Sequence, residues 1–492
     1  MSRDVSALIR AEEPTACRER FVLEPTAWRE MAEALPHAAL PLAGLWADGA
    51  QVHALFMDGV APLIASVAVP DGRYHALSPA RAGAQAHERI IHDLWGIEAM
   101  GARGTFPWLD QGHWPVTWPL RERPPPAPAA PEGVEFTDGA TMHGAGGTMV
   151  GHGPADGGFQ APFYLRLGLP GARVGTVSVR MGYAHRGLCA RMRGRMPVEG
   201  ARLVARIEAM ASVAHQRAFS HALAAATGRI LPEGEEKASV FLSELERIAS
   251  HLEILVQAAG LVADARFVAT GASLLERVRQ VCRDLCGRRF LFDVLPPAPG
   301  AARKLVLADG VVAELRAGCM ELMRLFRRPR GLATRTVDRG LLPADVARKW
   351  GIAGSTARAS GMEGDLRRYM PASRPEWTGG PLVGDVTARL AIRLRECRQG
   401  VEMLAALGGV AMPPVPPVPE HGSGEGLGLT EGPAGPVWHW LRLEGGRIAA
   451  WWCGDPSLAQ VQALPDILSG AMEADVALIL ASLGLSAASA DL

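Results

Sequence analysis

The chain has 492 residues, 48% of them hydrophobic, and its 51 Lys and Arg residues balance 51 Asp and Glu residues. A chain without net charge has no electrostatic drive toward nucleic acid or an anionic membrane surface, so we expect neither as a partner. The length exceeds that of one ordinary hydrophobic core and predicts at least two domains. The expected fold class is α+β, with a small mixed α/β N-terminal domain and a large, mainly helical domain that carries small β elements.

The first residues, "MSRDVSALIRAEEP", carry charges where a secretory signal needs an apolar core. No uninterrupted apolar run approaches the roughly 18 residues of a membrane-spanning helix. The seven cysteines are scattered and odd in number, which fits a reducing compartment. We therefore expect a soluble, cytoplasmic protein whose membrane contact comes through partners.

Residues 1–120 show the pattern of a compact mixed domain. Short strand-like runs between Gln51 and Val69 are separated by Asp-Gly and Pro turns. The segment from Arg121 to Gly133 follows and contains five prolines. Such a run continues neither a helix nor a central strand, so we expect an extended, semi-rigid linker at the boundary to a second domain over residues 134–492.

The second domain is expected to be mostly helical. Lys237 to Ala259 places its apolar residues at alternating steps of four and three, which indicates one apolar stripe on a packed helix. The elements expected in chain order are a strand-rich segment over Gly144 to Gly182, helices over Glu199 to Thr227, Lys237 to Ala259 and Asp385 to Leu407, a loop over Met412 to Gly428, and a final helix over Pro465 to Leu485.

Generic motifs reveal no catalytic machinery. "GAGGTMVGHG" lacks the lysine of a phosphate-binding loop, no HExxH spacing occurs, and no Ser, Cys or Thr lies in a nucleophile elbow. Cys282 and Cys286 share one helix face, but two thiols alone do not form a zinc or iron–sulfur site. Buried thiols behave as small hydrophobes, so we expect these two to pack.

Five blocks of the sequence, in order, resemble one family. "ERIIHDLWGIEAMGARGTFPWLDQGHWP" (Glu88 to Pro115) resembles the small peripheral-arm subunit of respiratory complex I. "VRMGYAHRGLCARM" (Val179 to Met192) resembles the quinone-site subunit of complex I and the large subunit of membrane-bound energy-converting NiFe hydrogenases. The later blocks are "FLSELERIASHLEIL", "GIAGSTARASGMEGDLRR", and "LTEGPAGPVWHWL" with "QALPDILSGAMEADVALILASL". A fusion of the two subunits is similar to the large subunits of formate hydrogenlyase-like complexes.

The resemblance also shows what this chain lacks. In the hydrogenases it resembles, two CxxC thiolate pairs hold the NiFe centre, and the soft thiolates suit nickel and iron. Counting from the matched motifs, the four positions hold Glu208, Ala211, Ser486 and Ser489. One carboxylate and two hydroxyls cannot replace four thiolates, so no metal is expected.

Quinone is the next candidate ligand implied by the resemblance. In complex I its headgroup is held by a histidine in a Gly-Pro-x-His loop and by a tyrosine on the helix after the His-Arg-Gly motif. Asp156 stands at the histidine position and Ala209 at the tyrosine position, while His152 is four residues out of register. What remains is an expected polar cavity, with Asp156, Glu208, Ser486 and Ser489 as candidate linings.

Other polar residues have two interpretations each. Arg206 matches an arginine that lies beside the terminal iron–sulfur cluster of a partner subunit in the family; the alternative is an ordinary buried salt bridge. Glu244, Arg247 and His251 share a helix face and form either a structural network, which we favour, or a proton relay. His185 and Arg186 are expected to anchor a turn and a subunit contact.

Taken together, the resemblance implies a subunit of a membrane-associated respiratory oxidoreductase complex of the NADH-quinone oxidoreductase or hydrogenase type, without a NiFe centre, that couples electron transfer to ion translocation. The implied partners are a small iron–sulfur subunit and antiporter-like membrane subunits, at the cytoplasmic face of the inner membrane. No cofactor is expected on this chain itself, with quinone as a candidate ligand. The alternative is a non-catalytic scaffold or coupling subunit of a transporter-like complex.

Overall fold

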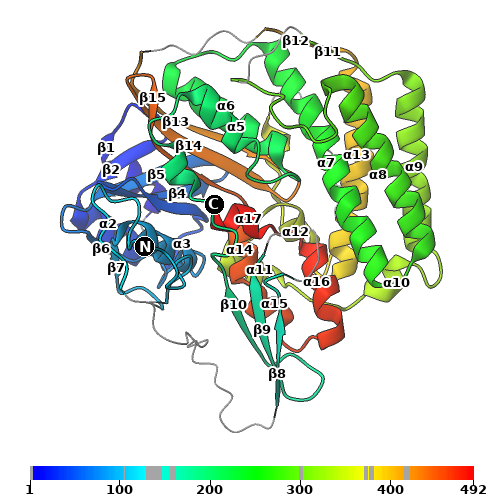
Figure 1. Cartoon of the computed structure of the whole chain (residues 1–492), viewed down its shortest axis with the longest axis horizontal. Coiled ribbons are helices and arrows are strands. Elements are labelled where there is room, and N and C mark those ends of the chain that lie inside the picture. Colours follow the sequence, from blue (N-terminus) through cyan, green and yellow to red (C-terminus); the bar gives the residue numbers. More distant parts are fainter. Residues whose placement is uncertain are drawn as a thin grey trace.

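The structure is a computed structural model that describes residues 4–104, 106–128, 147–155, 162–297, 303–370, 375, 382–414 and 421–492. Its N-terminal part contains a five-stranded sheet ordered β1-β2-β5-β4-β3 (Figure 1). The strands are β1 (Glu13–Pro14), β2 (Arg20–Leu23), β3 (Leu42–Ala47), β4 (Gln51–Asp58) and β5 (Ala61–Ala68). The expected strands between Gln51 and Val69 are confirmed, since β4 and β5 form an antiparallel hairpin.

Helices and a small second pair of strands complete the N-terminal part. They are α1 (Val5–Arg10), α2 (Pro25–Ala34), the 3-10 helix η1 (Leu35–His37), α3 (Ala84–Trp95), β6 (Arg73–His75) and β7 (Glu98–Met100). The beginning of the proline-rich segment packs back on this part. Thr117 N donates to Pro125 O at 2.9 Å and Arg121 Nε donates to Trp95 O at 2.7 Å. The expected extended linker thus packs against the N-terminal part over residues 121–128, and residues 129–133 lie outside the described residues.

A three-stranded antiparallel sheet follows, and it projects from the body of the molecule (Figure 1). Its strands are β8 (Thr148–His152), β9 (Tyr164–Leu169) and β10 (Thr176–Arg180). They confirm the expected strand-rich segment over its described residues.

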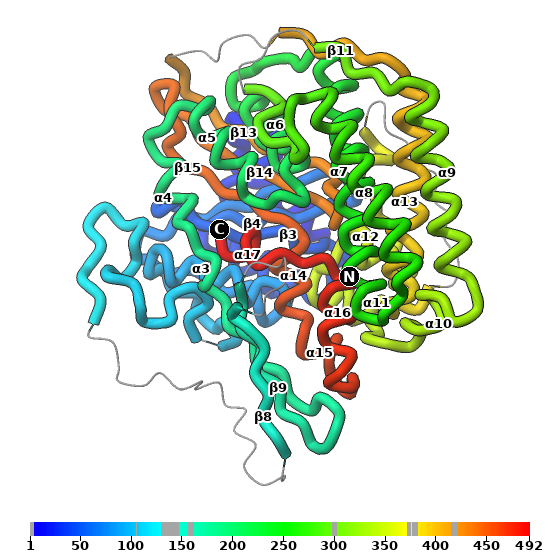
Figure 2. Tube along the Cα trace, turned by 45° about the vertical axis from the view of Figure 1, so that its right-hand side comes forward, coloured from blue at the N-terminus to red at the C-terminus, as the bar shows by residue number. Residues whose placement is uncertain are grey.

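The large domain is built on long helices. Four of them, α7, α8, α9 and α13, lie side by side in Figures 1 and 2. The helices up to α13 are α4 (Leu188–Met192), α5 (Pro197–Val204), α6 (Ser212–Thr227), α7 (Glu233–Leu261), α8 (Ala265–Cys286), α9 (Asp309–Arg327), α10 (Leu332–Thr336), α11 (Ala344–Trp350), α12 (Gly354–Ala359), the 3-10 helix η2 (Leu366–Tyr369) and α13 (Val386–Leu407). The expected helices within α7 and α13 are confirmed, and Asp385 caps α13 by accepting from Ala388 N at 2.7 Å.

A second β layer lies under α6. It contains β13 (Gly424–Glu431), β14 (Pro436–Glu444) and β15 (Arg447–Gly454), while β11 (Arg303–Leu305) pairs with β12 (Val410–Met412). A Cβ on Gly428 would collide with Ala218 O, so the alternating glycines of "GEGLGL" let the helix rest directly on the strand. The loop expected up to Gly428 is therefore wrong at its end, where β13 begins.

Two expected helices are interrupted. The helix expected over Glu199 to Thr227 stops at the end of α5 and resumes at α6, which leaves Ala205 to Ala211 outside both helices. The helix expected over Pro465 to Leu485 is divided as well, into α15 (Leu464–Leu468), η3 (Glu473–Asp475) and α16 (Val476–Leu483), and it is flanked by α14 (Ser457–Gln462) and α17 (Ala487–Asp491). Gly484 separates α16 from α17 with a left-handed φ of 64°.

The N-terminal sheet and the large domain share one hydrophobic core. Trp46 on β3 packs on Trp438 of β14 with 4.9 Å between ring centroids. A Cβ on Gly44 would collide with the Trp438 ring, and Arg20 pairs with Glu425 at 2.7 Å. In the part of the chain that the structure describes, no helix is both long and apolar enough to cross a membrane.

Candidate functional site, a carboxyl-lined pocket

The break between α5 and α6 forms one wall of a pocket. Residues 207–211 of the break face the turn over residues 432–435 and the segment over residues 484–488, around a volume of about 370 Å³. Arg186 explains why the helix breaks here without a proline. Its guanidinium donates to the carbonyl oxygens of Arg206 and Ile207 at 2.9 and 3.0 Å, and these oxygens would otherwise accept helical hydrogen bonds.

The other side of the break is stabilised by a carboxyl group from α7. Val213 N and Ala214 N donate to the two oxygens of Glu246 at 2.6 and 3.0 Å. Glu246 thus satisfies the first N–H groups of α6 in place of a local cap. The two long-range contacts divide a sequence that by itself favours a continuous helix.

The structure gathers most of the cavity residues inferred from the motifs. Glu208, Ala209, Ala211 and Ser486 line the pocket. Ser489 lies in α17, where its hydroxyl donates to Ser486 O at 3.1 Å and also contacts the Glu208 carboxyl group. Asp156 lies outside the described residues.

Glu208 is a half-buried acid that has no bonded guanidinium among the described residues. Burial raises the pKa of Glu208 to about 8, and the neighbouring carboxyl groups of Asp455 and Glu246 add to this, while hydrogen bonds from Ser486 and Ser489 act in the opposite direction. A carboxyl group in such surroundings holds its proton at neutral pH. Glu208 can therefore donate a hydrogen bond into the pocket.

Asp455 is the second acid of the pocket, and sequence reasoning missed it. It follows β15, lines the pocket, and accepts from Ser457 N at 2.7 Å. Burial raises its pKa, but contacts with His215, Ser489 and the Ser457 backbone outweigh burial and hold the pKa of Asp455 below the usual value. Two neighbouring carboxyl groups thus differ in protonation, one neutral and one ionised.

Arg186 and His185 hold the C-terminal segment against the break. Arg186 donates to Ala488 O at 2.7 Å. His185 Nδ1 lies 2.7 Å from Asp491 O, and its ring stacks on Trp114 with 5.0 Å between centroids. These residues anchor a turn and support the pocket from outside its wall.

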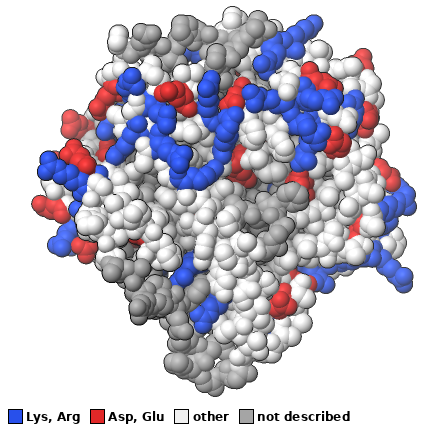
Figure 3. All heavy atoms as spheres, in the orientation of Figure 1, with Lys and Arg blue, Asp and Glu red and all other residues white. Residues whose placement is uncertain are grey.

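Arg206 points away from the pocket. Its guanidinium binds both oxygens of Asp293 at 2.7 and 2.6 Å, and 46% of its side chain is exposed. Arg206 therefore forms a salt bridge, as one interpretation of the sequence expected, but at the surface and not in a buried site. It belongs to a group of exposed arginines on or next to α4 and α5, and Figure 3 shows Lys and Arg side chains gathered as a blue band on the upper part of one face of the molecule.

Glu244, Arg247 and His251 belong to a buried cluster that we call the guanidinium network. Its members are Glu244, Arg247, His251, Arg358, Asp365, Arg367, Arg393, Glu396 and Glu431. Arg247 donates to the carbonyl oxygens of Glu431 and Gly432 at 2.8 and 2.7 Å, which holds the turn beside the Glu208 pocket.

The network favours structure over proton transfer. His251 Nδ1 lies 3.2 Å from Arg393, which can only donate, so Nε2 carries the proton and donates to Glu396 at 2.8 Å. Burial lowers the pKa of His251 to about 3 despite Glu396. A neutral histidine between guanidinium groups that keep their protons is a poor relay.

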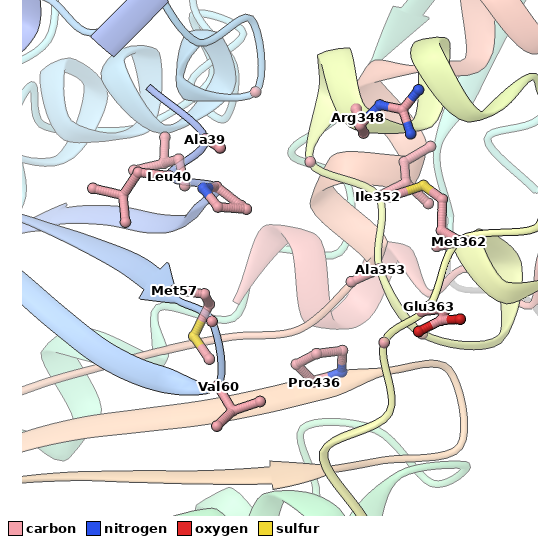
Figure 4. Close-up of a pocket in the computed structure, with 18 of the residues that line it drawn as sticks. Ala39, Leu40, Met57, Val60, Arg348, Ile352, Ala353, Met362, Glu363 and Pro436 are labelled. Atoms are coloured by element: carbon pink, nitrogen blue, oxygen red, sulfur yellow. The ribbon is translucent and has the colours of Figure 1, made fainter. Parts of the chain in front are cut away.

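A larger cavity, of about 760 Å³, lies between the segment over residues 38–42 with the β4–β5 turn and the segment over residues 348–369 (Figure 4). Leu40, Met57 and Val60 face Ile352 and Met362 across it. Its buried carboxyl groups, those of Asp365 and Glu431, are already paired with arginines of the network. The Glu208 pocket is therefore the better candidate for chemistry.

A buried group of imidazole and thiol side chains is a further place where a metal could bind. In the described part of the chain, one group of three offers ligand atoms within 4.8 Å of one another, namely His215, His439 and Cys453. Trp451 Nε1 donates to His439 Nδ1 at 3.1 Å, so His439 Nε2 carries a proton and has no lone pair for a metal. The four positions that match the NiFe ligands of hydrogenases do not fit a NiFe centre either, because Glu208, Ala211, Ser486 and Ser489 supply no thiolate.

Comparison with known proteins agrees with the motifs. Residues 276–408 match the family described as respiratory-chain NADH dehydrogenase, 49 Kd subunit. The membrane-bound hydrogenase subunit alpha of Pyrococcus furiosus is 26% identical over 67% of this chain and 84% of its own length. The chain is thus similar to subunits of a membrane-bound hydrogenase and of NADH-quinone oxidoreductases.

Two further relatives extend this result. An NADH-quinone oxidoreductase subunit of Dehalococcoides mccartyi is 29% identical over 68% of this chain and 95% of its own length. Formate hydrogenlyase subunit 5 of Escherichia coli is 25% identical over 83% of this chain and 75% of its own length. A chain of the solved membrane-bound sulfane sulfur reductase, an archaeal respiratory membrane complex, shares the fold with a TM-score of 0.63 and 21% identity, over 70% of this chain and 98% of that one.

Proposed function

We propose that this chain is the large peripheral subunit of a membrane-attached respiratory oxidoreductase complex, and that Glu208 gives and takes a proton in the pocket where related hydrogenases hold NiFe. The relatives support membership of such a complex, since they are subunits of hydrogenases, an NADH-quinone oxidoreductase and a formate hydrogenlyase. The observation that carries the proposal is that Glu208 and Asp455 line one pocket, and that the described residues lining it include no thiol.

The pocket suits proton donation to a reducible acceptor. A protonated carboxyl group is one O–H donor, and a general acid is most effective when its pKa lies near the working pH. We propose that electrons arrive from the cluster of a small iron–sulfur partner and that the acceptor, with quinone as the candidate class, receives a proton from Glu208. The energy released would then drive ion translocation in antiporter-like membrane subunits.

The exposed arginines beside the pocket support docking of a partner on this face. Arg191, Arg195, Arg202 and Arg206 are exposed on or next to α4 and α5, although the whole chain has no net charge. A surface with an excess of positive charge steers a partner of the opposite sign. Through this partner and the membrane subunits, the chain would be held at the cytoplasmic face of the inner membrane.

The test uses the purified complex. We expect no stoichiometric nickel and no hydrogen evolution, because the pocket supplies no thiolate. Glu208→Gln should lower acceptor reduction by about a hundredfold while assembly stays intact, since the amide cannot give up a proton. The matched control is Glu253→Gln, which changes an acid of the same pocket that is already paired with Arg279.

Two results would contradict the proposal. Metal analysis that finds about one nickel per chain would overturn the absence of a NiFe centre, because nickel retention requires a preorganised set of soft ligands. Full activity of the Glu208→Gln complex would remove Glu208 from the mechanism.

The second candidate is a coupling subunit on which no turnover occurs. One residue of the pocket wall favours this second candidate. Ala209 stands where the family uses a tyrosine to bind quinone. In that case Glu208→Gln would leave electron transfer through the complex unchanged and abolish only the linked ion transport. Measuring both rates on the same preparation separates the two functions.

A further inference from the structure

A chain of buried aromatic rings leads from β15 to the Glu208 pocket. Trp451 Nε1 donates to His439 Nδ1 at 3.1 Å, and His439 Nε2 lies 3.1 Å from His215 Nδ1. The three side chains come from β15, β14 and α6, and all are buried. They lie side by side because Trp451 stands two residues before Cys453, the register partner of His439, and so shares its face of the sheet, while α6 rests on the same sheet.

The donors of this chain all point the same way. An indole N–H can only donate, so His439 Nδ1 is an acceptor and the proton of His439 is on Nε2. His439 therefore donates to His215 Nδ1, and His215 in turn carries its proton on Nε2. Burial lowers the pKa of His439 well below its usual value, which keeps its ring neutral, as this direction requires.

The last donor faces Asp455. His215 Nε2 lies 3.8 Å from Asp455 Oδ2, which is longer than a hydrogen bond, and it has no hydrogen-bond partner among the described residues, although the ring is fully buried. Other groups also act on the carboxyl pair. Glu246 of α7 and the two serines of the C-terminal segment face Glu208, and Arg186 lies close enough to interact with Glu208.

We propose that the Trp451–His439–His215 chain is a positioning device that keeps Asp455 as the ionised member of the carboxyl pair, so that the exchangeable proton belongs to Glu208. The proposal deepens the function proposed above and rests on it for the use of that proton. The indole N–H of Trp451 does not release its proton, so no proton can enter or leave through the Trp451 end of this row of rings. Glu208 must therefore exchange its proton through the pocket.

The experiment follows the Glu208 carboxyl group by infrared difference spectroscopy of the assembled complex during a pH titration. A band of a protonated carboxylic acid that Glu208→Gln removes should disappear with a midpoint at about pH 8. Asp455→Asn should lower this midpoint by about one pH unit or more, because the neighbouring charge is gone. Trp451→Phe frees the tautomer of His439 and should lower the midpoint by a smaller amount.

Trp452→Phe changes a neighbouring tryptophan outside the chain and should leave the midpoint unchanged. A midpoint unaltered in Asp455→Asn, or a wild-type complex without the band, would overturn the carboxyl pair. A shift in Asp455→Asn with none in Trp451→Phe would overturn the role of the ring chain. Failure of the proposed function is separate, since it appears as unchanged turnover in Glu208→Gln whatever the titration shows.

Discussion

The Glu208 pocket and the guanidinium network both bury carboxyl groups, yet they treat these groups in opposite ways. Glu396 accepts from Arg358 at 2.9 Å and from His251 at 2.8 Å, and although burial opposes ionisation, these partners hold the pKa of Glu396 well below its usual range. Glu208 has hydroxyl partners, and burial raises its pKa to about 8. Glu396, beside guanidinium groups, is thus held as a fixed charge, whereas Glu208, beside hydroxyls and a second acid, can exchange a proton.

The guanidinium network supports the structure of the Glu208 pocket, and the pocket carries the proposed chemistry. Arg247 ties the network to the backbone at Glu431 and Gly432, and Gly432 lines the Glu208 pocket. Arg393 donates to Leu483 O at 2.7 Å, at the end of α16 just before the pocket segment. The fixed charges of the network thus hold two walls of the pocket in which the exchangeable proton lies.

The largest expected effect comes from breaking the network. Arg358→Met leaves Glu396 and Glu431 without their shared cation in a buried site. We expect the free energy of unfolding to fall by about 3–5 kcal/mol, the cost of an unpaired buried charge, as measured by chemical denaturation. Arg316→Met removes an exposed ion pair with Glu402 and should cost less than about 1 kcal/mol. Equal losses in the two variants would contradict the network's role.

The pH dependence of stability should have opposite signs in the two regions. The pKa of Glu208 is raised from 4.5, so the stability that this group contributes is present below about pH 4.5 and is lost as the pH rises toward 8. Glu208→Gln should therefore gain stability relative to wild type over this range, by an amount on the order of a few kcal/mol.

Glu396 supplies the contrast for that measurement. Because its pKa is lowered, its contribution is present above about pH 4.5 and is lost in acid. Glu396→Gln should be least stable relative to wild type at neutral pH, and the deficit should shrink on acidification. Denaturation curves for both variants across pH measure this, and parallel pH profiles would show that the two acids do not differ.

A smaller loss is expected from the clamp outside the pocket. Arg186→Gln removes hydrogen bonds to the carbonyl oxygens of Arg206, Ile207 and Ala488, which hold the helix break to the C-terminal segment. We expect the free energy of unfolding to fall by about 1–3 kcal/mol. Faster amide hydrogen exchange should be confined to residues 205–211 and 486–492, and Arg191→Gln, at an exposed position, should change neither quantity.

The smallest effect should come from a hydroxyl group in the pocket. Ser486 donates to Glu208 and favours its ionised form. Ser486→Ala should therefore move the infrared midpoint of Glu208 upward by less than about one pH unit, opposite to Asp455→Asn. Ser250→Ala, which alters another hydroxyl of the pocket wall, should leave the midpoint unchanged. A downward shift in Ser486→Ala would show that the hydroxyl stabilises the neutral acid.

Local patterns in the sequence determined much of this protein. The four-and-three spacing of apolar residues predicted α7 and α13, and the Asp-Gly turn predicted the β4–β5 hairpin, because such signals act within a few residues. Motif spacing also placed Glu208 and Ser486 at matched positions of one site, and both line the same pocket.

Only the tertiary structure decided the rest. The helix expected through residue 208 breaks because Arg186 and Glu246 supply hydrogen-bond partners from distant parts of the chain. Contact with His215 helps to hold the pKa of Asp455 below its usual value. His215 is 240 positions away in the sequence, and no local pattern indicates this contact. The pKa of Glu208 is likewise a property of what surrounds it, since burial and a second carboxyl group arise only when α6, β15 and the C-terminal segment pack together.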